Sequence, residues 1–408
     1  MTKLEAMTAK LKQCASTVAV VGLGYVGMPL LRKALDAGFD VIGIDTNHTL
    51  VTELQSAVYD WTQEPIDRGR LRVYGSKNWP EVSRADIVVI CVPTPITDDR
   101  APDMSAVKAV VGKLHTVGRP HQQLVILEST VYPGATADLF AEPRGRMIAY
   151  SPERIDPGNH DDPGAITKVV GSPCPETLEL AQLFYEMLGV TTVGTDSWEA
   201  AESAKLLENI YRCVNIALVN EMKIIFTKMG IDIWEVIRLA KTKPFGFQPF
   251  YPGPGMGGHC IPVDPFYLSW AARRVGEDAL FIERAGQINN RMPNYVAGRI
   301  MRHLNDVGKC MKGSKILLLG VAYKKGVADI RNSPTLALSP LLRRAGAEVT
   351  LADPYITQYW EHGIDYSKYD CAVVMTDHEE FPWVKIRNES QMVIDTRGVY
   401  EDEIVRQA

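Results

Sequence analysis

The sequence lacks paired cysteines and long apolar runs. Its seven cysteines are odd in number and scattered, and no two form a Cys-x-x-Cys pair. Neither a disulfide framework nor a zinc knuckle is therefore indicated. No segment approaches the roughly 18 consecutive apolar residues that a membrane-spanning helix needs, and the start of the chain has no apolar signal-peptide core. We expect a protein of the reducing cytoplasm that does not enter a membrane.

The chain also lacks a run of charges of one sign. Lys and Arg total 44 and Asp and Glu total 49, interleaved to give a net charge of −5, which argues against nucleic acid as a partner. No His, Asp or Glu spacing is typical of a metal site, so we expect no metal. With 408 residues, 46% of them hydrophobic, the chain can build two or three domains.

The order of apolar runs predicts an α/β fold with two Rossmann-like, doubly wound parallel-sheet domains joined by a long central helix. Residues 17–45 show a strand–helix–strand pattern, and further strand-like runs follow at 87–92, 124–127 and 169–170. Turn residues thin out over 197–239, which predicts one long helix or two in succession. A similar strand–helix–strand pattern returns over 315–351. We expect domains at 1–196, 197–300 and 301–408.

A glycine-rich turn follows the first predicted strand and opens a helix. It reads Gly22, Leu23, Gly24, Tyr25, Val26, Gly27. Glycines at these spacings allow a tight turn, close approach of a pyrophosphate and close helix–strand packing. Asp45 ends the second strand, where a carboxylate can accept hydrogen bonds from ribose hydroxyls and repels a 2′-phosphate. The pattern predicts NAD as cofactor, rather than a turn that merely packs.

A loop dense in Pro and Gly, residues 244–265, carries Cys260 and, four residues later, Asp264. A free thiol has a pKa of about 8.5, so a nucleophilic cysteine needs a nearby cation or base. Lys205 and Asn209 are four residues apart in the predicted helix and share a face, where they would stabilise an oxyanion. The alternatives are an inert loop cysteine and a solvated helix face.

Several motifs in order along the chain identify a resemblance. They are Val21–Gly27, Val92–Pro95, Glu128–Gly134, Ser151–Arg154, Ala204–Asn209, Gly257–Cys260 and Tyr323–Arg331. With them the chain resembles, over essentially its full length, the nucleotide-sugar 6-dehydrogenase family. The resemblance implies a four-electron oxidation of a sugar C6 hydroxymethyl group to a carboxylate by two NAD⁺ in succession, through a thiohemiacetal and a thioester on the enzyme.

The resemblance also implies roles for particular residues. Cys260 would be the nucleophile, with Lys205 and Asn209 stabilising the oxyanions and Asp264 orienting water and accepting a proton. Glu153 would be the general base and Thr130 the hydroxyl that holds its water. The expected NAD contacts are Gly22, Gly24, Tyr25, Val26, Gly27, Asp45, Thr94, Thr130 and, from the C-terminal domain, Arg331. The expected substrate contacts are Glu153, Arg154, Lys205, Asn209, Tyr251, Gly257, His259 and Lys324.

The resemblance assigns NAD to the first domain, dimerisation and the cysteine loop to the second, and the UDP of a UDP-sugar to the third. A homodimer is expected, because the second face of the long helix would otherwise lie bare. His259 before the cysteine and Val263–Pro265 after it are similar to the UDP-N-acetylhexosamine branch. Thr242–Gly246, with the run Tyr251–Gly255, is most similar to enzymes that act on UDP-N-acetylglucosamine. UDP-N-acetylmannosamine and UDP-glucose are the rival substrates. The rival functions are a single-step NAD-dependent hydroxyacid dehydrogenase and a non-catalytic nucleotide-binding regulator.

Overall fold

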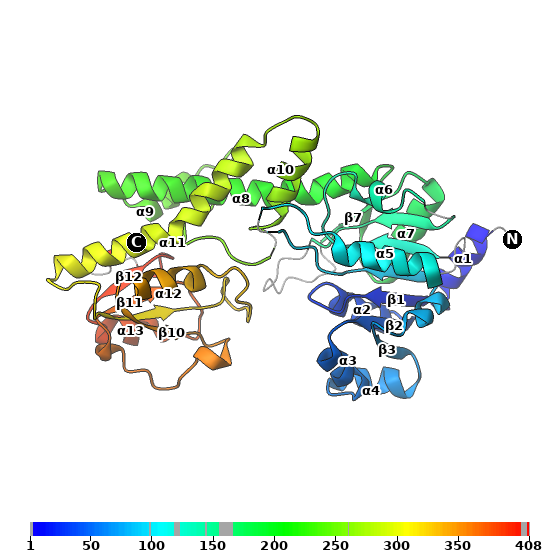
Figure 1. Cartoon of the computed structure of the whole chain (residues 1–408), viewed down its shortest axis with the longest axis horizontal. Helices are drawn as coiled ribbons and strands as arrows, with labels where there is room; N and C mark the ends of the chain where they lie inside the picture. Colours follow the sequence, from blue (N-terminus) through cyan, green and yellow to red (C-terminus); the bar gives the residue numbers. More distant parts are fainter. Residues whose placement is uncertain are drawn as a thin grey trace. The chain divides into compact units, whose positions relative to one another are not determined.

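The computed structural model describes residues 3–97, 99–117, 123–142, 145–154, 166–259, 261–400 and 406–407. The chain divides into two compact units, Met1–Leu207 and Glu208–Ala408. The boundary falls inside one long helix, α8 (Trp198–Met229) (Figure 1).

The first unit is built on a sheet that has eight strands in the described residues, in the order β3-β2-β1-β4-β5-β6-β7-β8. Neighbouring strands are parallel except β6 and β7, which pair antiparallel at Tyr150 and Gly171. Short β-branched runs buried on both faces explain the central strands. The strands are β1 Thr17–Val21, β2 Asp40–Asp45, β3 Leu71–Gly75, β4 Ile87–Ile90, β5 Leu124–Leu127, β6 Met147–Tyr150, β7 Lys168–Gly171 and β8 Thr192–Thr195.

Helices connect these strands and cover the sheet. The central strands pack their buried side chains, Val18 and Val20 among them, against Leu31 of α2 and Phe184 of α7 in one large apolar core. The helices of this unit are α1 Lys3–Lys12, α2 Gly27–Asp36, α3 His48–Gln55, α4 Asp60–Asp67, α5 Ser105–Val117, α6 Ala135–Leu139 and α7 Pro175–Met187, with the 3-10 turn η1 Trp79–Arg84. This core fixes the carboxyl ends of the strands, where the loops of the site begin.

The second unit begins with helices and ends with a smaller sheet. Its helices are the rest of α8, then α9 Ile233–Ala240, α10 Asp264–Arg274, α11 Leu280–Asp306, α12 Pro334–Arg344 and α13 Trp383–Glu389, with the 3-10 turns η2 Thr357–Tyr359 and η3 Tyr366–Lys368. The sheet is parallel, in the order β10-β9-β11-β12-β13. Its strands are β9 Lys315–Leu319, β10 Glu348–Ala352, β11 Cys371–Val374, β12 Val393–Asp395 and β13 Arg406–Gln407.

Apolar clusters cover both faces of this second sheet. One face packs Ile316 and Leu318 against α11 and α12, and the other packs Leu317 and Leu319 with Phe381 and Ile386. Alternate residues of β9 thus point to opposite cores, as expected for a doubly wound sheet.

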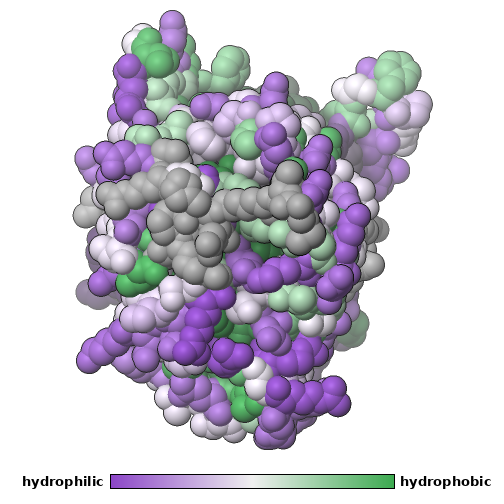
Figure 2. Space-filling view, turned by 90° about the vertical axis from the view of Figure 1, so that its right-hand side faces the viewer, coloured by the Kyte–Doolittle hydropathy of each residue, from purple (hydrophilic) through white to green (hydrophobic). Residues whose placement is uncertain are grey.

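The α/β class, the two parallel sheets and the long helix expected from the sequence are confirmed. The predicted loop over residues 244–265 is two residues too long, because α10 begins at Asp264. On the face shown in Figure 2, hydrophilic residues predominate and hydrophobic residues lie in small groups. Among the helices in the described part of the chain, none combines the length and apolar character needed to cross a membrane.

Candidate active site

The glycine-rich turn lies between β1 and α2, as the sequence predicts. Gly22 has a φ of +91°, and a Cβ at Gly27 would collide with the carbonyl oxygen of Gly22. At Gly24 a Cβ would meet nothing within 4 Å. Two of the glycines are therefore required by the fold itself, whereas Gly24 leaves open space beside the start of α2, where amides favour a phosphate. Tyr25 is exposed beside this space.

Asp45, at the end of β2, holds this turn in place. One carboxylate oxygen accepts a hydrogen bond from the Leu23 amide at 2.6 Å, and the other accepts one from the Asn47 amide at 2.7 Å. The side chain is only partly buried. It therefore lies at the turn with acceptor capacity left for ribose hydroxyls, so the residues present fit an NAD adenosine.

Thr94 and Thr130 lie in the loops that follow β4 and β5. The Thr94 hydroxyl donates to the Thr130 carbonyl oxygen at 2.8 Å, and the Ser129 hydroxyl donates to the Val92 carbonyl oxygen at 2.7 Å. Because β4 lies beside β1 in the sheet, these loops flank the point where the strand order reverses. Ligands of doubly wound sheets bind at this point.

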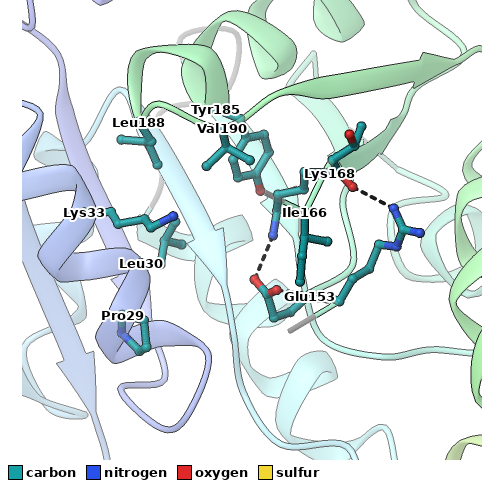
Figure 3. Close-up of a pocket in the computed structure, with 11 residues that line it drawn as sticks. Pro29, Leu30, Lys33, Glu153, Ile166, Lys168, Tyr185, Leu188 and Val190 are labelled. Carbon is teal, nitrogen blue, oxygen red and sulfur yellow. Dashed lines mark hydrogen bonds and ion pairs between the residues drawn. The ribbon is translucent and has the colours of Figure 1, made fainter. Parts of the chain in front are cut away.

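Glu153 and Arg154 follow β6 and lie beside a small pocket (Figure 3). The carboxylate of Glu153 pairs with Lys168 at 3.1 Å and also accepts a hydrogen bond from the Arg154 amide at 2.7 Å. The Arg154 guanidinium donates to the Thr167 carbonyl oxygen at 2.6 Å. Glu153 is therefore part of an ion-pair network rather than a lone surface charge.

The two polar residues predicted on the central helix are buried. Lys205 is 7% exposed and Asn209 is 3% exposed, so the alternative of a solvated helix face is wrong. The Asn209 side-chain amide donates to a carboxylate oxygen of Asp264 at 2.6 Å. Asp264 is itself 4% exposed and is the first residue of α10. This bond connects α8 to the residue four positions after Cys260.

The cysteine loop packs on the segment that follows β9. The Gly258 amide donates to the Arg331 carbonyl oxygen at 2.8 Å, and the Asn332 side chain donates to the Gly258 carbonyl oxygen at 2.8 Å. A Cβ at Gly257 would collide with Tyr323. The glycines thus allow a backbone approach that places His259 in this contact region. Cys260 itself lies outside the described residues.

The remaining predicted residues of the second unit are spread along the same region. Tyr251 is half exposed and stacks on Trp234, with ring centroids 6.0 Å apart. Lys324 is partly exposed. The Arg331 guanidinium pairs with Asp329 at 2.6 Å. Burial opposes ionisation of Asp329, but the hydrogen bonds from Arg331 prevail and lower the pKa of Asp329.

The turn after β9 resembles the first glycine turn but is filled by the protein. Asp353 accepts hydrogen bonds from the Val321 and Ala322 amides at 2.6 and 2.7 Å. The buried His378 ring lies 3.2 Å from the same oxygen. Despite the opposing effect of burial, the bonds from His378 and the amides lower the pKa of Asp353. Asp353 therefore holds this turn as Asp45 holds the first one, but Ala322 and Lys325 stand where the first turn has Gly24 and Gly27, so the glycine pattern is not repeated.

Sequence reasoning missed three residues that contact the site network, namely Glu128, Lys168 and Tyr185. In the sequence, Glu128 stands out only as part of a motif, and Lys168 stands out only as a charged residue at the start of a strand. In the part of the chain that the structure describes, no group of three or more His, Cys, Asp or Glu side chains is arranged to hold a metal ion.

A doubly wound sheet that carries a dinucleotide turn is typical of nucleotide-dependent oxidoreductases. Models of the UDP-glucose/GDP-mannose dehydrogenase family match the chain in three parts: the NAD binding domain at residues 16–189, the central domain at 199–291 and the UDP binding domain at 317–402. The chain belongs to this family. It is an NAD-dependent UDP-sugar dehydrogenase, which confirms the enzyme class and the cofactor expected from the sequence.

Individual relatives cover nearly the whole chain. A UDP-N-acetyl-D-glucosamine 6-dehydrogenase of Pseudomonas aeruginosa is 35% identical over 89% of this chain and 91% of its own length. A UDP-N-acetyl-D-mannosamine dehydrogenase of Methanococcus maripaludis is 30% identical over 96% of this chain and 95% of its own. The solved structure of a UDP-D-ManNAc dehydrogenase from Pyrococcus horikoshii, 29% identical, matches with a TM-score of 0.87 over 96% of this chain and 98% of that one.

Proposed function

We propose that this enzyme oxidises the C6 hydroxymethyl group of UDP-N-acetylglucosamine to the uronic acid. The overall reaction consumes one sugar nucleotide, two NAD⁺ and one water, and gives the carboxylate, two NADH and three protons. NAD⁺ is the hydride acceptor in both oxidations. A covalent bond to the enzyme between the two oxidations explains how the aldehyde is retained.

In this mechanism Cys260 adds to the C6 aldehyde and forms a thiohemiacetal, which is oxidised to a thioester and then hydrolysed by water. Lys205 and Asn209 donate hydrogen bonds to the oxyanions, and Asp264 orients water and accepts a proton. Glu153 is the general base, with Thr130 holding its water. Hydrolysis breaks the C–S bond and returns the thiol.

The observation that carries the proposal is the 2.6 Å hydrogen bond between Asn209 and Asp264. Both side chains are buried and paired with one another, and Asp264 follows Cys260 by four residues, a position that supports a role in the chemistry. The buried Lys205, one helical turn from Asn209, adds the positive charge that a developing oxyanion needs.

The choice of sugar in the UDP-sugar substrate depends on the residues around Cys260 and on the relatives. The residues on both sides of Cys260 support a UDP-N-acetylhexosamine, and the names of relatives divide between the glucosamine and mannosamine epimers. UDP-N-acetylmannosamine and UDP-glucose are the alternatives. Absorbance at 340 nm with a panel of UDP-sugars distinguishes them, and a purely binding role predicts no sugar-dependent NADH at all.

Cys260→Ser should lower steady-state turnover on the order of 1,000-fold or more, because the serine hydroxyl is a poor nucleophile without a dedicated base. Wild-type enzyme should release two NADH per sugar consumed. The control is Cys310→Ser, which changes an exposed cysteine. Substantial turnover by Cys260→Ser, with one NADH per substrate, would instead establish a single-step dehydrogenase.

A further inference from the structure

A buried network lies under the loop that carries Glu153. Its members are Glu128 after β5, Lys168 at the start of β7 and Tyr185 on α7, and we call it the Lys168 network. The Lys168 ammonium lies 3.1 Å from Glu128 and 3.1 Å from Glu153. The Tyr185 hydroxyl donates to Glu128 at 2.5 Å. Figure 3 shows the Lys168 side chain directed at the Glu153 carboxylate.

Burial differs sharply across this network. The side chain of Glu128 is fully buried and that of Lys168 is 9% exposed, whereas that of Glu153 is 24% exposed. The inner carboxylate is therefore enclosed by the protein, and the outer one reaches towards solvent. Lys168 also lies over the Tyr185 ring, 4.9 Å from its centroid. An ammonium held by a buried carboxylate and a ring has little freedom to move.

The charges of the network favour one protonation state of Lys168. Burial works to lower the pKa of Lys168, but the two carboxylates outweigh it and raise the pKa well above its ordinary value. Burial raises the pKa of Glu128, and Lys168 acts against that shift. Lys168 therefore keeps its charge at neutral pH, where it faces the outer carboxylate as a permanent cation.

We propose that Lys168 is a positioning residue for Glu153. Glu128 and Tyr185 hold the ammonium, which in turn holds one carboxylate oxygen of Glu153 and keeps that side chain in one orientation. The inference rests on the proposed function, in which Glu153 is the general base. Lys168 does not touch substrate in this scheme. It fixes where the base lies and favours its ionised form.

The groups that face the Glu153 carboxylate come from several elements. Lys168 on β7, Glu128 after β5 and Cys91 after β4 interact with it electrostatically, whereas Lys33 on α2 and Arg154 line the same pocket. Loss of Lys168 removes the cation that is paired with Glu153. This disfavours the carboxylate form of Glu153, so the pKa of Glu153 should rise.

The test compares Lys168→Met with Lys168→Arg, and Lys33→Met serves as the control because Lys33 lines the same pocket. Lys168→Met should lower kcat about tenfold or more, change KM for the UDP-sugar less than about threefold and shift the acidic limb of the kcat profile to higher pH. Lys168→Arg should restore most of kcat, and Lys33→Met should behave like wild type. An unshifted pH profile and wild-type kcat in Lys168→Met would overturn the proposal.

A second readout does not depend on turnover. Thermal unfolding is measured for Lys168→Met, Glu153→Gln and the double variant, all in a Glu128→Gln background so that no unpaired buried carboxylate remains. If the pair is real, the double variant should lose less in Tm than the sum of the two single losses. Strict additivity would refute the pairing. A wild-type enzyme that oxidises no UDP-sugar would refute the proposed function instead, so the two failures can be told apart.

Discussion

Lys223 is a buried cation that the proposed reaction does not use. It lies on α8, is 3% exposed, and burial lowers its pKa to about 8 from an ordinary 10.5. Asp232 and Asp395 partly offset this effect, whereas Arg299 adds to it. At pH 7 the residue is charged in both the folded and the unfolded chain. The folded state therefore bears the full free-energy cost of burying this charge, on the order of 3 kcal/mol from the pKa difference.

Lys223→Met should accordingly raise Tm at pH 7. Between about pH 8 and 10.5 the unfolded chain binds more protons than the folded one, so wild-type stability gains on the variant as pH rises. The difference in Tm should shrink by pH 10. Thermal unfolding at both pH values checks this, with the exposed Lys228→Met as the control. A variant that is less stable than wild type at pH 7 would contradict the prediction.

At the scale of single residues, the sequence predicts those features of the site that follow from the spacing of residues along one helix or strand. Lys205 and Asn209 could be placed on one face because four residues make about one helical turn. Their burial could not be predicted, because it depends on the tertiary packing around α8. Glu128 and Lys168 are 40 positions apart and meet only because the strands β5, β6 and β7 lie side by side. No local pattern encodes that order.

At the scale of elements, the turn between β1 and α2 contains one glycine that the fold requires and another that we expect the cofactor to require. Gly27→Ala should lower Tm, because its Cβ would collide with a backbone oxygen that cannot move away. Gly24→Ala should leave Tm nearly unchanged and still weaken NAD binding, because its Cβ would enter open space where we expect the pyrophosphate to bind. Calorimetric titration with NAD⁺ beside thermal unfolding checks both variants. Wild-type NAD affinity in Gly24→Ala would exclude a pyrophosphate from this space.

The elements that sequence reasoning missed are short strands with weak signals. β3 mixes buried and partly exposed residues, and β8 has the edge position and a partly exposed surface. β6 is four residues long and pairs with both a parallel and an antiparallel neighbour. These segments become strands because the sheet beside them offers hydrogen-bonding partners, and a reading of single segments does not include those partners.

For the whole molecule, we propose that the enzyme is a homodimer associated through α8. Large exposed hydrophobic residues recur on that helix at spacings of four and seven, which places them along one stripe: Leu207, Tyr211, Leu218, Ile225 and Met229. Light scattering should give a mass of about 90 kDa, twice the 45.2 kDa of one chain. Leu218→Glu, which puts a charge in the middle of the stripe, should give the single-chain mass. A wild-type monomer at working concentration would contradict the proposal.

The position of the unit boundary inside α8, between Leu207 and Glu208, restricts how such an enzyme can be recombined with its relatives. A chimaera joined there must preserve helical phase, because one inserted or deleted residue rotates everything that follows by about 100°. Such a shift would turn Asn209 off the face it shares with Lys205. Insertions and deletions in this stretch should therefore be tolerated, in evolution or in the laboratory, only in steps that restore whole turns.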